Sequence, residues 1–116
     1  MPSIVQGSIV WAVIPDSRGG NPKNRPAVVL TSNSQIDPQG EVELAAITSL
    51  LGDARFSETV ELPWHPDGHP QTGLSKPSEV VCTWLAATRA VDVADSGKIL
   101  PPQLLFEVLD KVNAFK

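Results

Sequence analysis

The chain has 116 residues, of which 41% are hydrophobic and 19% charged, and its formal net charge is −4. This length and composition indicate one folded domain over residues 1–116 and exclude a disordered chain. No apolar run approaches the roughly 20 residues of a membrane span, and the N-terminus lacks a signal-peptide pattern, so we expect a cytoplasmic protein without membrane contact. The acidic balance argues against broad binding to duplex DNA, but it leaves room for a local basic site that binds a short single strand.

The first part of the chain predicts two strands joined by a long polar loop. Residues 8–14 and 27–31 are apolar runs rich in β-branched side chains, which suit buried strands. Residues 16–24 contain Gly-Gly and a proline, which break both strands and helices, so we expect no regular structure there.

A cluster of cations lies in and beside this loop. Arg18, Lys23 and Arg25 fall within eight residues on an otherwise acidic chain, and Pro26 favours extended backbone at Arg25. Such a cluster is either a phosphate-binding site or a solvated loop whose charges favour solubility, and the residues alone leave both open.

The middle of the chain predicts two further strands. Residues 41–48 alternate polar and apolar side chains at their start, and the run ends at Thr48 and Ser49, whose hydroxyls are common in turns. Residues 50–57 form a polar connection to a short alternating strand over residues 58–62.

A loop rich in proline and histidine follows, over residues 63–73. Three prolines and two glycines exclude regular structure, so His65 and His69 do not form the helical pair that a metal site would need. Titrating groups, a stacking platform for a base together with Trp64, or plain exposed residues remain the open interpretations.

The last part of the chain predicts one strand and one helix. Residues 78–85 form a strand that continues with a kink to residue 91, and residues 92–98 form a turn. Cys82 lies in this strand and is expected to be a small buried hydrophobe without a disulfide partner.

The end of the chain predicts a helix, and prolines suit its first positions. Its apolar stripe faces a core, while Phe106 lies off the stripe and either meets a partner subunit or is exposed. The stripe comprises Leu104, Leu105, Val108, Leu109, Val112 and Phe115. The sum is an α+β domain, mainly β, with a curled antiparallel sheet and a C-terminal helix.

Several short motifs, in the same order along most of the chain, resemble the MazF/PemK-like toxins of bacterial type II toxin–antitoxin systems. They are Gly7 with the Ile-Val-Trp run, the Arg25–Leu30 segment, residues 46–49, residues 73–81 and residues 97–100. The resemblance implies an SH3-like β-barrel, a homodimer, and a cognate antitoxin peptide that lays apolar and acidic side chains over a basic groove. It also implies a metal-independent endoribonuclease that needs no cofactor and cleaves single-stranded RNA at short sequences.

The same resemblance implies that Arg25 and Thr48 are catalytic and lie next to each other across the sheet. The ribose 2′-hydroxyl attacks the adjacent phosphorus, so negative charge builds on the phosphoryl oxygens. Arg25 offers a planar fork of donors, which suits electrostatic stabilisation first and acid–base work second, while Thr48 holds the phosphate. We identify no general base. The candidate RNA contacts are Arg18, Lys23, Ser49, His65 and His69.

Two departures from the family pattern concern the expected substrate groove. Residues 21–24 read Asn-Pro-Lys-Asn where relatives often carry a glutamate, and the Pro- and His-rich loop is not a family feature that we recognise. Three outcomes are therefore open: the RNase activity is retained with a different cleavage sequence, it is weak, or it is absent. Two alternatives stay open, namely a CcdB-like toxin that poisons DNA gyrase without cleaving RNA, to which residues 113–116 give faint support, and a catalytically inactive binding domain.

Overall fold

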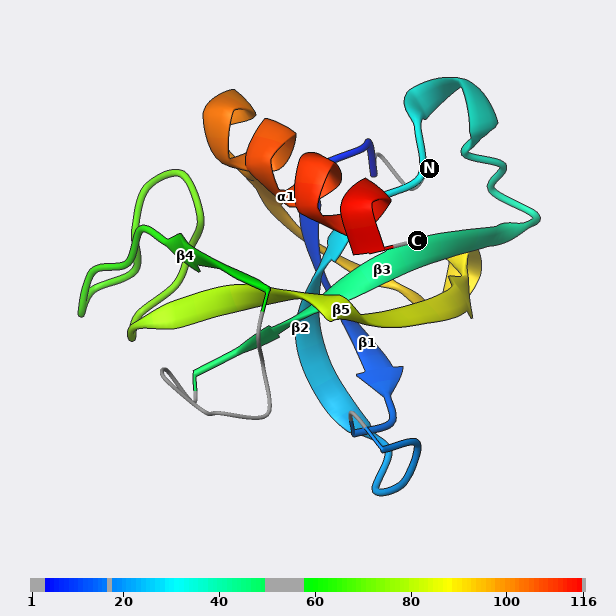
Figure 1. Cartoon of the computed structure of the whole chain (residues 1–116), viewed down its shortest axis with the longest axis horizontal. Helices are drawn as coiled ribbons and strands as arrows, with labels where there is room; N and C mark the ends of the chain where they lie inside the picture. Colours follow the sequence, from blue (N-terminus) through cyan, green and yellow to red (C-terminus); the bar gives the residue numbers. More distant parts are fainter. Residues whose placement is uncertain (1–3, 17, 50–57, 116) are drawn as a thin grey trace.

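The computed structural model describes residues 4–16, 18–49 and 58–115. Over these ranges six strands form one antiparallel sheet in the order β4-β5-β3-β2-β1-β6, followed by a C-terminal helix (Figure 1). The elements are β1 (Ser8–Ile14), β2 (Lys23–Val29), β3 (Glu41–Thr48), β4 (Thr59–Leu62), β5 (Ser78–Arg89), β6 (Ala94–Ile99) and α1 (Pro102–Phe115), with short 3₁₀ turns at Asn33–Gln35 and Ala90–Asp92. The predicted fold class, a curled, mainly antiparallel sheet with one C-terminal helix, is confirmed. The connection expected over residues 50–57 lies outside the described residues.

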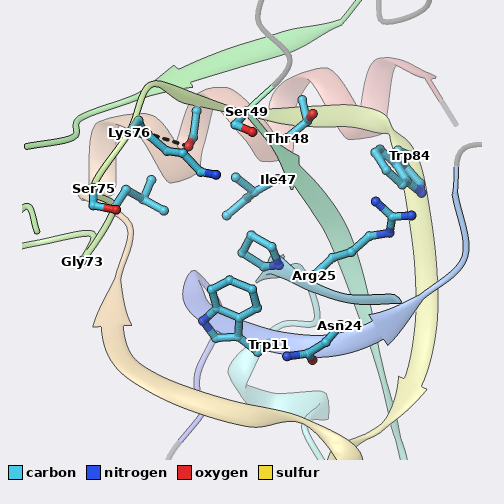
Figure 2. A pocket seen from close by; sticks show the side chains of 13 residues that line it. Trp11, Asn24, Arg25, Ile47, Thr48, Ser49, Gly73, Ser75, Lys76 and Trp84 are labelled. Carbon is cyan, nitrogen blue, oxygen red and sulfur yellow. Dashed lines mark hydrogen bonds between the residues drawn. The ribbon is translucent and has the colours of Figure 1, made fainter. Parts of the chain in front are cut away.

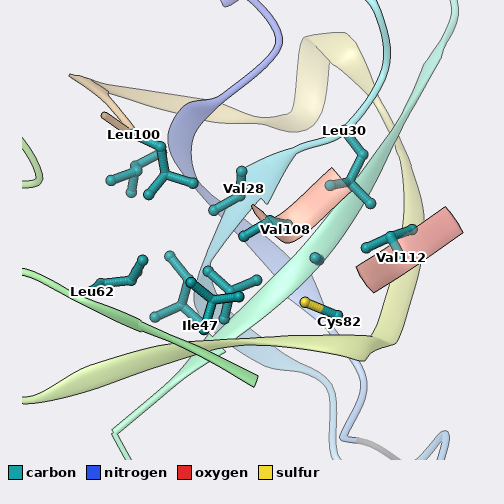
Figure 3. Packing of buried hydrophobic residues seen from close by; sticks show 12 residues of the cluster. Val28, Leu30, Ile47, Leu62, Cys82, Leu100, Val108 and Val112 are labelled. Atoms are coloured by element: carbon teal, nitrogen blue, oxygen red, sulfur yellow. The ribbon is translucent and has the colours of Figure 1, made fainter. Parts of the chain in front are cut away.

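Alternation along the strands divides the buried side chains between the two faces of the sheet. On one face, Val28 and Ile47 belong to an apolar cluster that includes Val108 and Val112 of α1, together with the buried thiol of Cys82 (Figure 3). The opposite face carries a second cluster, which includes Val10, Ala12, Ile14, Ala27 and Leu44. The buried hydrophobic position expected for Cys82 is confirmed.

Two segments predicted as loop or turn belong to strands. Lys23 and Asn24 begin β2, because they pair with the end of β1. Residues 94–99 form the edge strand β6, in which Ser96 and Gly97 make a bulge, since Ile9 pairs with Lys98 while Val10 pairs with Asp95. The predicted turn is therefore a bulge within β6, and the backbone pairing with β1 keeps the residues on both sides of the bulge in the strand.

The ends of three other elements differ from the prediction. β2 ends at Val29 and not at residue 31. β5 continues to Arg89, but its irregularity lies earlier than expected, because β3 residues 45 and 47 pair with β5 residues 85 and 80. Phe115 was expected on the buried stripe of the helix and is instead 55% exposed, since it lies at the last position of α1, and Phe106 is exposed as well. Within the described residues, no helix is long and apolar enough to cross a membrane.

Candidate functional site

A cavity of about 400 Å³ lies where β2 and β3 separate (Figure 2). The two strands pair only over residues 27–29 and 44–46, and Pro26, which has no N–H to donate to a ladder, comes directly before the paired stretch. The described residues that line this Arg25 cavity are Trp11, Asn24, Arg25, Pro26, Ile47, Thr48, Ser49, Gly73, Leu74, Ser75, Lys76, Ser78 and Trp84.

Arg25 and Thr48 reach the cavity from neighbouring strands. Ala27 pairs with Ala46, Arg25 comes two residues before the first, and Thr48 comes two residues after the second. Side chains two residues apart in a strand point to the same face, so both project from one face of the sheet at one cavity. Thr48 is 8% exposed at the end of β3, and Ser49 follows it at the exposed rim. The catalytic and RNA-binding roles of these three residues remain predictions.

The guanidinium of Arg25 is held in a defined orientation. Its Nε–H donates to the backbone oxygen of Ile14 at 3.0 Å, and one Nη donates to the backbone oxygen of Asn21 at 3.3 Å. Its central carbon lies 5.0 Å from the centroid of the Trp84 ring, which is a cation–π geometry. The Trp84 indole N–H in turn donates to the backbone oxygen of Pro15 at 3.0 Å.

The loop that contributes Asn21 is organised by the carboxylate of Asp16. This carboxylate accepts hydrogen bonds from the backbone N–H groups of Arg18 and Gly20, at 2.9 and 3.0 Å, and from the side chain of Asn21. The bonds from Gly20 and then Arg18 are the main reason that the pKa of Asp16 lies below its ordinary value, with a smaller contribution from the charge of Arg25.

The charge inside the Arg25 cavity is opposite to that of the chain. Among the described lining residues the charged side chains are Arg25 and Lys76, and none is Asp or Glu, although the whole chain has a net charge of −4. Trp11, which is labelled in Figure 2, is 42% exposed, and it is paired with Pro26 in the register of β1 and β2, so the two form an apolar wall of the cavity. Two cations, hydroxyl groups and a flat aromatic surface can together hold a phosphate and an adjacent base.

The other predicted RNA contacts do not line this cavity. Arg18 and Lys23 are exposed, in the β1–β2 loop and at the start of β2. The backbone N–H groups of His65 and His69 both donate to the oxygen of Leu74 at 3.0 Å, and each Nδ1 accepts a backbone N–H two residues further on. The histidines therefore close the loop that supplies Leu74 to the cavity. In the described part of the chain no group of three or more His, Cys, Asp or Glu residues could hold a metal ion.

Among the lining residues that were not predicted as part of the site, Trp11, Lys76 and Trp84 bear most on its chemistry. Trp11 carries a signal, because it is a large aromatic residue in a strand whose exposed positions, Trp11 and Val13, alternate with buried ones. Lys76 and Trp84 give no such signal, since the loop before β5 and the irregular pairing within β5 bring them to the cavity.

Comparison with known proteins agrees with this fold. Residues 5–115 match the family described as PemK-like, MazF-like toxin of type II toxin-antitoxin system. A crystal structure of MazF from Deinococcus radiodurans aligns with a TM-score of 0.72 and 22% identity, covering 97% of this chain and 94% of that one. A MazE–MazF structure from the same organism gives 0.66 and 20%, covering 97% and 93%. An endoribonuclease in complex with its cognate antitoxin, from a mycobacterial species, gives 0.60 and 13%, covering 98% and 93%. No curated protein matches the chain.

Proposed function

The chain belongs to the PemK-like, MazF-like toxin family of type II toxin–antitoxin systems, and on this premise we propose that it is an endoribonuclease that cleaves single-stranded RNA. The observation that carries the proposal is the meeting of Arg25 and Thr48 at one cavity whose described charged side chains are both cationic. A cavity with two cations, hydroxyl groups and an exposed tryptophan suits the backbone and an unpaired base of a single strand.

The reaction is an internal transfer at phosphorus. The 2′-oxygen forms a bond to the adjacent phosphorus and loses its proton, while the bond to the 5′-oxygen breaks and that oxygen gains a proton. The products are a 2′,3′-cyclic phosphate and a 5′-hydroxyl end. The step exchanges one phosphorus–oxygen bond for another, so it needs no oxidant and no cofactor.

The side chains of the cavity act mainly on charge. Arg25 donates to the phosphoryl oxygens as negative charge builds on them, and because its guanidinium stays protonated at neutral pH it does not serve as the base. Thr48 donates its hydroxyl to the same phosphate and fixes its position. Lys76 adds a second positive charge, and Trp11 stacks on a neighbouring base.

The biological setting follows from the family. We propose that the chain is a toxin that acts as a homodimer and is neutralised by an antitoxin peptide, which covers the cationic cavity with acidic and apolar side chains. The relatives solved as MazE–MazF and as a toxin with its cognate antitoxin support such a partner. A purified chain that stays monomeric at micromolar concentration would contradict the dimer.

The decisive experiment is digestion of single-stranded RNA in the presence of EDTA, with mapping of the new 5′ ends. Wild type should cut at a short recurring sequence, and Arg25→Ala should cut at least about 100-fold more slowly, the scale of losing one oxyanion donor. Arg89→Ala is the matched control, because Arg89 is exposed at the far end of β5 and lies outside the cavity. Full activity in folded Arg25→Ala would refute the role of Arg25. Inhibition of DNA gyrase without RNA cleavage would instead favour a CcdB-like toxin.

A further inference from the structure

Trp84 reaches Arg25 from an irregular part of β5. Between the pairs Ala45–Leu85 and Ile47–Val80, β5 has three more residues than β3, and Trp84 lies in this stretch. Its ring faces the guanidinium at 5.0 Å (Figure 2). Its indole N–H donates a hydrogen bond to the backbone oxygen of Pro15. The ring is thus fixed at its polar end to the segment that follows β1.

We propose that Trp84 is a positioning residue, which sets the plane in which Arg25 presents its free N–H groups to the scissile phosphate. This inference rests on the proposed nuclease function. The ring face fixes the plane of the guanidinium, while the bonds to Ile14 and Asn21 fix its rotation within that plane. Those two bonds use two of the five N–H groups of an arginine, so three remain for a ligand.

Holding an arginine with a ring differs chemically from holding it with a carboxylate. The ring and the two backbone oxygens carry no formal charge, so they orient the guanidinium without neutralising it, and the charge of Arg25 is only a minor contribution to the lowered pKa of the Asp16 carboxyl. Without the ring, Arg25 keeps its charge but samples more orientations. Attraction of the RNA then persists, whereas alignment with the reacting phosphate is lost, and the effect falls on kcat more than on KM.

A spectroscopic test of the contact needs no RNA. The Nε–H resonance of Arg25 is assigned by its loss in Arg25→Lys, and its chemical shift, solvent exchange and order parameter are measured in wild type and in variants. In Trp84→Leu the signal should move towards the position of free arginines, exchange faster and show a lower order parameter, while Trp84→Phe keeps most of the wild-type behaviour. Trp64→Leu is the control for the loss of an indole, because Trp64 does not line the cavity, although at 43% it is more exposed than the partly buried Trp84.

Kinetics then test the consequence. In Trp84→Leu, kcat should fall about 10- to 100-fold with KM changed less than about threefold, and Trp84→Phe should recover most of the loss. If Trp84→Leu does not fold, Trp84→Met removes the ring at a more similar volume and is judged by the same criteria. An unchanged Arg25 signal in either variant overturns the proposal, and so does a normal kcat. A wild type that cuts no RNA refutes the nuclease function, while the resonance still decides whether Trp84 orients Arg25.

Discussion

Lys76 offers a quantitative test of the cationic cavity, because it is the second of the two described charged residues that line it. Replacing it with methionine keeps the length and apolar part of the side chain and removes one positive charge. Each phosphate neutralised on a single strand contributes about −0.7 to the slope of log K against log salt concentration. Lys76→Met should therefore make this slope about 0.7 less steep. When the salt concentration rises fourfold, both proteins lose affinity, and the fold loss of the variant should be about 2.6 times smaller than the fold loss of wild type.

The measurement is fluorescence anisotropy with a short single strand whose 2′-hydroxyls are methylated, so that binding is observed without cleavage. Lys111→Met is the matched control, since it changes the net charge equally but lies on α1, where its Nζ donates to the oxygen of Thr59. Equal slopes in the two variants would show that Lys76 does not contact a phosphate, which would contradict the second positive charge assigned to the binding site.

Three further predictions concern the fold around the site. Gly7→Ala should destabilise the protein by about 1–3 kcal/mol in denaturant unfolding, because φ is +94° and the new Cβ would lie 2.8 Å from Leu105; unchanged stability would contradict this. The pKa of Asp16 is lowered, so its ionised carboxylate stabilises the loop at any pH above 3.8, the ordinary pKa of an aspartate, and this stabilisation is lost as the pH falls below 3.8. A ¹³C titration of the Asp16 carboxyl with a midpoint at or above 3.8 would contradict this prediction. Burial raises the pKa of the Cys82 thiol to about 11, so iodoacetamide at pH 8 should alkylate it far more slowly in the native protein than in guanidinium chloride, and equal rates would exclude a buried thiol.

The elements that local pattern determines could be predicted from the sequence. The runs that became β1 and β3, and the stripe of α1, carry a periodicity that tertiary structure did not override. β6 could not be predicted, because its residues are polar and exposed and it is a strand only through its backbone pairing with β1. In such an edge strand, the partner decides the conformation more than the side chains do.

The residues of the candidate site likewise divide into those that could be predicted from the sequence and those that could not. Arg25 and Thr48 could be named from their motifs, and the register of β2 and β3 then brings them to one cavity. Trp84 and Lys76 could not, because their places depend on the irregular pairing within β5 and on the loop before it. Side chains that act on a neighbour far away in the sequence leave no local pattern, so the residues that orient a catalytic group are harder to predict than the group itself.

The proposed binding of RNA by an acidic chain depends on how the charges are distributed. The chain carries 13 acidic and 9 basic residues, so its net charge does not attract a strand, and beyond the Debye length of about 8–10 Å the charges are largely screened. Attraction acts only once a phosphate has entered the cavity, next to Arg25 and Lys76. A carboxylate partner for Arg25 would cancel half of that local charge, whereas the ring of Trp84 cancels none of it. In the proposed complex, recognition therefore depends on the fit of a single strand inside the cavity, where the two cations lie.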